Sequence, residues 1–219
     1  MKKEFKIRDA EIKDIDFLVE TIIEAEKSGT DKLSYSTIFG ITEDEVCKYL
    51  KEMLLEEIDG CELSVSSFLI AECEGNTAAA VSAWIEGKEG TPSAVLKGNL
   101  LNYILPKKCI EKAASLNEIT KEIHIEYIQN TIQLGAGYVA SEYRGHKLLG
   151  LLITEIIEKL RKEKSGIPNV WAQIFSCNIP SIKIHEGLDF KHIMTKESQN
   201  SEISNYLPSN KKFLFTKNL

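Results

Sequence analysis

The sequence has no long apolar run, no paired cysteine motif and no excess of positive charge, and each absence excludes a class of protein. No apolar run approaches the roughly 18 residues that a membrane-spanning helix requires. The start, MKKEFKIRDA, moves directly into charged residues without the apolar segment of a signal peptide. The net charge of −6 argues against nucleic acid as the main partner, because binding to phosphate demands a basic face. We therefore expect a soluble, cytoplasmic protein, monomer or homodimer, with neither a membrane nor a nucleic-acid partner.

The cysteines and the overall composition indicate an ordinary globular domain. The five cysteines are Cys47, Cys61, Cys73, Cys109 and Cys177, an odd set without C-x-x-C spacing. We expect them to be reduced thiols that mostly fill the core, and we expect no metal site. A chain of 219 residues that is 43% hydrophobic and 27% charged can bury a substantial core, so we predict one domain over residues 1–219.

The first third of the chain has the pattern of a strand followed by two helices. Phe5 to Arg8 alternates apolar and polar residues, as a half-buried strand does. Apolar residues then recur at helical spacing from Ile12 to Ile23, and Gly29 closes this helix. Thr42 and Glu45 form a capping box, which predicts the start of a second helix.

The middle of the chain predicts a hairpin and then a helical insertion. Phe68 to Cys73 and Ala78 to Ile85 are apolar runs separated by Glu74-Gly75-Asn76-Thr77, which is typical of a β-hairpin. The next segment, about residues 86–121, is longer than a usual connection and too apolar for a linker. It has helical spacing before Pro106 and again from Ile110 to Leu116, so we expect helices beside the substrate cleft.

Two further strand patterns precede the part of the chain that is richest in functional signals. Ile123 to Tyr127 and Thr131 to Val139 form either one bulged strand or a hairpin that turns at Gln129-Asn130. Gly135 and Gly137 indicate a bulge or a close approach of the backbone to another group.

The stretch from Leu134 to Ile153 predicts a strand, a polar turn and a helix. The turn, Arg144-Gly145-His146-Lys147, leads into apolar residues at helical spacing from Leu149 to Leu160. At a helix start the unpaired N–H groups and the positive end of the macrodipole favour an anion, best of all a phosphate. The alternative for this stretch alone is an ordinary turn with solvated cations.

Two motifs in this half of the chain resemble those of the GNAT superfamily of N-acetyltransferases. The run from Val139 to Gly145, VASEYRG, resembles the V-x-P-E-Y-R-G ending of motif A, with Ser141 in place of proline. Lys147 and Leu149 stand where the following loop pattern, Q/R-x-x-G-x-G/A, has glycines. After a strand pattern from Val170 to Phe175, the run from Asn178 to Phe190 resembles motif B, N-x-x-A-x-x-x-Y-E-x-x-G-F, with His185 for tyrosine and Asp189 for glycine. The start of the chain, I-R-D-A-E-I, also resembles the amino terminus of the family.

The resemblance implies an α/β (α+β) fold with a central mixed, mostly antiparallel twisted sheet flanked by helices. Lys212 to Thr216 is expected to supply the last strand, and the loop from Ser28 to Ile41 is either a wall of the acceptor cleft or a plain surface connection. The resemblance also implies acetyl-coenzyme A (acetyl-CoA) as co-substrate. The residues expected to bind it are Gly137, Tyr138, Val139, Arg144, Gly145, His146, Lys147, Leu148, Leu149, Gly150 and Asn178.

Acetyl transfer to an amine requires a base for the amine, polarisation of the carbonyl and protonation of the leaving thiolate. The family tyrosine commonly serves as the acid, so His185 is a candidate in its place, with a packed or exposed helix histidine as the alternative. Glu126 is a candidate base, acting directly or through water, with a solvated strand carboxylate as the alternative. Cys177 is a weaker candidate nucleophile, because no histidine and acidic partner are spaced to indicate a triad.

We therefore predict an N-acetyltransferase in which a primary amine of a small molecule or protein attacks acetyl-CoA directly in a ternary complex. The competing hypothesis is a degenerate domain that senses acyl-CoA or contacts a partner without catalysis. Loss of both loop glycines and the tyrosine favours this second hypothesis, whereas Arg144, Gly145 and Asn178 oppose it. A generic phosphate-binding α/β module would need a full P-loop or dinucleotide fingerprint, and the sequence has neither.

Overall fold

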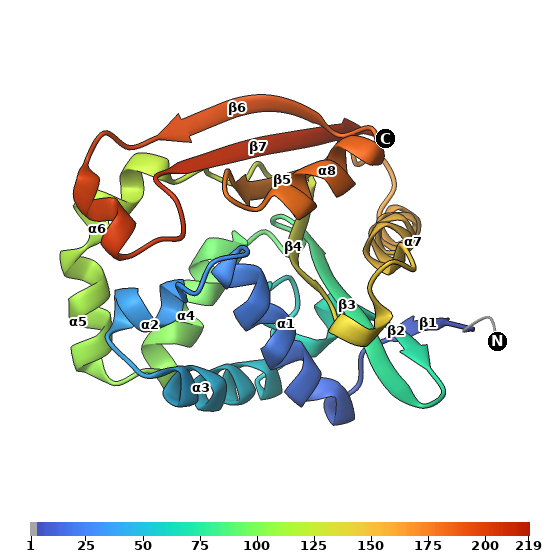
Figure 1. Ribbon diagram of the computed structural model, residues 1–219, viewed down its shortest axis with the longest axis horizontal. Coiled ribbons are helices and arrows are strands. Elements are labelled where there is room, and N and C mark those ends of the chain that lie inside the picture. Colours follow the sequence, from blue (N-terminus) through green and yellow to red (C-terminus); the bar gives the residue numbers. More distant parts are fainter. Residues whose placement is uncertain (1–3) are drawn as a thin grey trace.

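One seven-stranded sheet forms the centre of the computed structural model, which describes residues 4–219 (Figure 1). Its order is β1-β2-β3-β4-β5-β7-β6. The strands are β1 (Lys6–Asp9), β2 (Phe68–Cys73), β3 (Asn76–Ile85), β4 (Ile132–Val139), β5 (Asn169–Phe175), β6 (Lys191–Glu197) and β7 (Lys211–Asn218). The pair β4–β5 is parallel and the other neighbouring pairs of this sheet are antiparallel, so the predicted mixed, mostly antiparallel sheet is confirmed.

Helices cover both faces of the sheet. They are α1 (Ile15–Lys27), α2 (Ser34–Phe39), α3 (Glu43–Leu55), α4 (Ser93–Ile104), α5 (Lys107–Ser115), α6 (Asn117–Thr120), α7 (Leu148–Glu163) and α8 (Ile179–Gly187). Short 3-10 turns are η1 (Ile12–Asp14), η2 (Val65–Ser67), η3 (Lys121–Ile123), η4 (Ser141–Tyr143) and η5 (Ser201–Asn205). In Figure 1, α7 lies on one side of β3 and β4, and α1 lies on the other.

Alternation along β2 divides the apolar residues between two cores. Leu69 and Ala71 pack in one core with the buried face of α7, while Phe68 and Ile70 pack in a second core with α1 and α3. This follows from strand geometry, because successive side chains point to opposite faces of a sheet.

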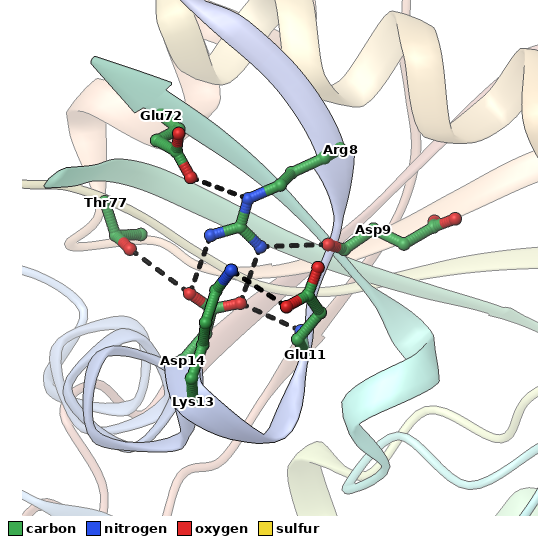
Figure 2. Close-up of polar contacts among 7 residues, drawn as sticks. All are labelled: Arg8, Asp9, Glu11, Lys13, Asp14, Glu72 and Thr77. Carbon is green, nitrogen blue, oxygen red and sulfur yellow. Dashed lines mark hydrogen bonds and ion pairs between the residues drawn. The ribbon is translucent and has the colours of Figure 1, made fainter. Parts of the chain in front are cut away.

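A partly buried ion-pair network joins the start of α1 to the sheet (Figure 2). The guanidinium of Arg8, on β1, donates from Nη1 to Oδ2 of Asp14 at 2.6 Å and from Nη2 to Oδ1 at 2.8 Å. Its Nε donates to Oε2 of Glu72, on β2, at 2.8 Å. Asp14 also accepts the backbone N–H of Glu11 at 2.8 Å, which holds the first turn in place. The network therefore fixes where α1 begins relative to β1 and β2.

The predicted helical segment at residues 86–121 forms α4, α5 and α6, and α4 ends just before Pro106 as expected. Glu86 is only 2% exposed and accepts the backbone N–H of Ser93 at 2.9 Å and Nε1–H of Trp84 at 3.0 Å. Leu100, Leu105 and Cys109 join the core that contains α1 and α3. These helices therefore extend the α1 side of the molecule and lie on the face opposite α7.

Three expectations about local structure need correction. The predicted strand at 123–127 is wrong: Ile123 ends the turn η3, and the carbonyl of Ile125 accepts Nε2–H of Gln173 at 2.9 Å instead of a strand partner. The loop between α1 and α3 contains α2. Strand β6 was not expected, because every one of its residues is exposed and it has no apolar alternation.

The five cysteines are free thiols, and Cys61, Cys73 and Cys109 are buried as expected of core fillers. Within residues 4–219, no group of three His, Cys, Asp or Glu side chains could hold a metal ion. No helix in this described part of the chain is both long enough and apolar enough to cross a membrane.

Candidate active site

A cleft of about 910 Å³ opens where β4 and β5 separate. The two strands pair only from Ile132↔Val170 to Leu134↔Ala172 in the described sheet, so both continue beyond the last shared position without each other. On its other side, β4 has a bulge against β3 between Val81 and Ala83. The predicted bulge is therefore confirmed. The separation leaves backbone groups on one edge of β4 without a strand partner, facing the cleft.

Glycines permit this bulged course of β4. A Cβ on Gly135 would collide with the side chain of Ser82, and a Cβ on Gly137 would lie 2.9 Å from Cδ1 of Leu149. A side chain at Gly135 would require Ser82 and Trp84 to move, and one at Gly137 would require the end of Leu149 to move.

The turn after β4 directs the start of α7 into the cleft. Gly145 has φ +86° and Lys147 has φ +60°, so the chain passes twice through the left-handed region. Lys147 is the N-cap of α7, and no side chain among the described residues caps this helix start. The N–H groups of Leu148, Leu149 and Gly150 therefore have no acceptor within the helix. A helix start of this kind, with two basic side chains beside it, favours a bound anion.

The residues expected to bind the cofactor converge on the cleft, with one exception. Those that line it are Gly137, Tyr138, Val139, Arg144, Gly145, Lys147, Leu148, Leu149, Gly150 and Asn178. His146 is exposed and packs on Phe5, with 5.2 Å between ring centroids, so its side chain does not belong to the lining. Asn178 caps α8 by accepting the backbone N–H of Ser181 at 3.2 Å. Arg144 donates from Nε to the carbonyl of Val139 at 3.2 Å.

His185 lines the cleft but is held as a buried, neutral imidazole. It is 6% exposed, and its Nδ1–H donates to the carbonyl of Ser181 at 2.8 Å, which leaves Nε2 with the lone pair. Nε2 has no hydrogen-bond partner among the described residues, and the ring meets Phe190 edge-on at 5.1 Å. Burial lowers the pKa of His185 more than the hydrogen bond to Ser181 raises it. At neutral pH, Nε2 is therefore an acceptor and not a proton donor.

Glu126 and Cys177 do not fit the roles considered for them from the sequence. Glu126 is exposed, lies outside the cleft lining, and belongs to the segment where the expected strand does not form. Burial raises the pKa of the Cys177 thiol, which favours the protonated form over a nucleophilic thiolate. Its S–H donates to the carbonyl of Ser28 at 3.6 Å.

The opposite end of the cleft contains charged residues that sequence reasoning missed. Glu26, in the last turn of α1, and Lys212, near the start of β7, both line it. Glu62 is ion-paired with Lys97 of α4, and Oη–H of Tyr127 donates to Oε2 of Glu62 at 3.3 Å. One signal could have indicated Glu26: it follows Ile22 by four residues, which places it on the buried face of the helix.

Burial sets the protonation of this end of the cleft. Desolvation raises the pKa of Glu26 and lowers that of Lys212, so each charged form is less stable than in water. Desolvation also raises the pKa of Tyr35 and Tyr127, which keeps both phenols neutral. The cleft thus has an anion-binding end at α7 and a desolvated, titratable end at α1 and β7.

A separating parallel strand pair, with an uncapped helix start at one end of the cleft, can hold a ligand that carries a phosphate. The model of the Acetyltransferase (GNAT) family matches residues 41–190. Because this match spans more than half of the 219 residues, the chain belongs to the GNAT acetyltransferase family. It is an acyltransferase that depends on acetyl-CoA.

Solved structures share this fold over nearly the whole chain. An N-acetyltransferase from Staphylococcus aureus Mu50 is 11% identical with a TM-score of 0.66, over 97% of this chain and 100% of its own. A ribosomal-protein-alanine N-acetyltransferase from Brucella melitensis is 19% identical with a TM-score of 0.55, over 98% of this chain and 99% of its own. The polyamine N-acetyltransferase of Drosophila melanogaster is 16% identical with a TM-score of 0.57, over 99% of this chain and 100% of its own. At these identities the likeness shows the fold alone. No curated protein matches the sequence.

Proposed function

We propose that the protein transfers the acetyl group of acetyl-CoA to a primary amine, which attacks directly in a ternary complex. The observation that carries this proposal is the separation of β4 from β5 beside the uncapped start of α7. It leaves a cleft with space for a donor at one end and an acceptor at the other. Solved structures named for ribosomal-protein alanine and for polyamine share the fold, so the fold by itself does not select the acceptor.

The residues at the α7 end fit the phosphate-bearing part of the cofactor. The N–H groups of Leu148, Leu149 and Gly150 would hold the pyrophosphate, and the cations of Arg144 and Lys147 would add full charges. The unpaired edge of β4, including Gly137, Tyr138 and Val139, would hold the pantetheine arm through backbone hydrogen bonds. When bound, acetyl-CoA supplies a thioester whose carbonyl carbon accepts the amine.

The chain's own groups must then move protons. A primary amine is mostly protonated at pH 7, so a base is needed before it can attack. Glu26 is suited to this role, because it lines the cleft and desolvation raises its pKa, which makes its carboxylate a stronger base. His185 can protonate the departing sulfur only as imidazolium, a form that its lowered pKa makes scarce at pH 7. We therefore expect any contribution of His185 as an acid to fall as the pH rises through this lowered pKa, and to be small already at pH 7.

Cofactor binding and turnover test the proposal separately. The melting temperature should rise with millimolar acetyl-CoA, because a ligand that binds the native state stabilises it. Arg144→Ala should reduce this rise, whereas Arg161→Ala, which removes a cation paired with Glu158 later in α7, should leave it unchanged. No rise for the wild type would refute cofactor binding at this cleft. A normal rise, with no thiol released for any amine, would favour the sensor hypothesis.

A further inference from the structure

Two opposite charges face the acceptor end of the cleft without pairing to each other. Glu26 and Lys212 both line it, and within residues 4–219 neither takes part in an ion pair with another side chain. The neighbouring Glu62 differs, because Lys97 neutralises it directly. The Nζ of Lys212 instead lies over the ring of Phe175, 4.8 Å from its centroid.

The energetic state of these two side chains is unusual. Desolvation is the largest influence on both pKa values and works against each charge. The ammonium groups of Lys97 and, less strongly, Lys212 lower the pKa of Glu26, and the carboxylate of Glu26 raises that of Lys212. Both side chains line one cleft, and neither is neutralised by an ion pair among the described residues. A desolvated charge without a direct partner is costly, so a ligand that supplies both missing partners gains binding energy from each.

The charge balance at this end excludes a simple preference for cations. Glu24, Glu26 and Glu62 all line the cleft, but Lys27 pairs with Glu24 at 3.5 Å and Lys97 pairs with Glu62. Among the described residues that line this end, this leaves the carboxylate of Glu26 and the ammonium of Lys212 without an ion pair. A ligand with two positive charges would meet Lys212 as a like charge. A ligand with one amine and one acidic group would instead place an opposite charge against each unpaired side chain.

We propose that the acceptor is a small zwitterion of the amino acid class, with its amine at Glu26 and its carboxylate at Lys212. This inference rests on the proposed acetyltransferase function. Glu26 takes one proton from the ammonium, and the freed nitrogen lone pair forms a bond to the acetyl carbonyl carbon. The carbon–sulfur bond breaks, the second nitrogen proton goes to the departing thiolate, and the products are an N-acetyl amino acid and coenzyme A.

Matched acceptors test the role of the carboxylate directly. A series of ω-amino acids from glycine to 6-aminohexanoate can each be compared with the alkylamine of the same carbon chain. We measure thiol release for kcat/KM, and calorimetric binding of each compound to the protein saturated with coenzyme A. At least one amino acid should exceed its amine by roughly tenfold or more in both measurements, because a charge-assisted hydrogen bond contributes about 1.5 to 3 kcal/mol.

Substitutions assign that preference to a residue. Lys212→Met removes the charge while keeping most of the length of the side chain. It should bring the amino acid to amine ratio close to one, while the rise in melting temperature with coenzyme A persists. Lys211→Met is the matched control, because Lys211 neighbours it on β7 but pairs with Glu197 at 3.1 Å and does not line the cleft. This control should keep the wild-type ratio.

The possible failures are distinguishable. If the wild type prefers the alkylamines, or uses both series equally, the zwitterion proposal is overturned while the acetyltransferase function stands. The proposal also fails if Lys212→Met folds and keeps the full preference. If the wild type does not bind coenzyme A, the proposed function itself fails. The wild-type comparison decides the matter even if Lys212→Met does not fold.

Discussion

Asp14→Asn would test how firmly α1, which carries Glu26, is fixed to the sheet. The side chain of Asp14 is 4% exposed, and both of its oxygens accept hydrogen bonds from Arg8 (Figure 2). Asparagine has nearly the same shape but replaces one acceptor oxygen with an NH₂ donor. That donor would face the N–H groups of the guanidinium, or the backbone N–H of Glu11, so at least one buried donor loses its acceptor.

The structure sets the size of the effect. Removing one partner of a buried ion pair costs roughly 3 to 5 kcal/mol, because the other charge is left uncompensated. Arg8 keeps the hydrogen bond from Nε to Glu72 and its side chain is 13% exposed, which moderates the loss. We therefore expect the free energy of unfolding to fall by about 3 kcal/mol. For a chain of this size that corresponds to a decrease of about 6 to 12 °C in the melting temperature.

Urea unfolding, followed by the fluorescence of the buried Trp84 and Trp171, measures the change. Lys13→Met is the control, because its ion pair with Glu11 is exposed and should contribute less than about 1 kcal/mol. A loss below about 1 kcal/mol for Asp14→Asn would refute the reasoning, since the network would then contribute no more than a surface pair.

The difference in the free energy of unfolding between the wild type and Asp14→Asn should also depend on pH, which gives an independent check. Burial pushes the pKa of Asp14 up, but hydrogen bonds from Arg8 and from the backbone of Glu11, with the Arg8 charge, outweigh it and the pKa is lowered. The unfolded chain therefore takes up the proton at higher pH than the folded protein. The stabilisation is fully present above the unfolded value of 3.8 and is lost as the pH falls through the folded pKa. The free energies of unfolding of the wild type and of Asp14→Asn should therefore become equal in acid.

Two further substitutions probe the cofactor end of the cleft. Lys147→Gly should raise the free energy of unfolding by about 1 kcal/mol, because a lysine at φ +60° is strained where glycine is not, and it should weaken acetyl-CoA binding by removing a cation. Denaturation and calorimetry measure the two effects, and tighter binding would contradict the charge argument. His185→Phe should make stability less dependent on pH below 6.5: burial lowers the folded pKa, so the wild type loses stability as the pH falls from 6.5 through that pKa. Equal acid sensitivity in both proteins would show that His185 does not control this loss.

Strands could be predicted from the sequence where the pattern of apolar side chains coincides with backbone pairing in the sheet. They could not be predicted where the two differ. Strands β2 and β3 are buried runs around a tight turn, so pattern and turn agree. The alternation of Ile123 and Ile125 led to the wrong prediction of a strand at 123–127. These two side chains fill two separate small clusters, while their backbone lies outside the sheet. Strand β6 has no buried face and therefore no signal, although its backbone pairs fully enough with β7 to form a sheet edge.

The two ends of the cleft differ in predictability for a related reason. Most of the cofactor end is built from one continuous stretch, the strand, turn and helix around Gly145, so its elements could be expected from local sequence. The acceptor end joins Glu26 near the start of the chain to Lys212 near its end. Only the packing of α1 and β7 brings these residues to one cleft, and no local pattern encodes their proximity.

The two missing loop glycines bear on whether the cleft is built to function. Glycine serves such a loop by reaching the left-handed region and by allowing close approach of the backbone. Lys147 reaches that region itself, at φ +60°, and adds a cation where an anion is favoured. Leu149 lies within the first turn of α7, and its Cδ1 approaches the position where a Cβ on Gly137 would be, at 2.9 Å. Gly137 on β4 therefore leaves room for the side chain of Leu149. The start of α7 therefore remains part of the cleft lining without either glycine, so the two replacements do not argue against cofactor binding.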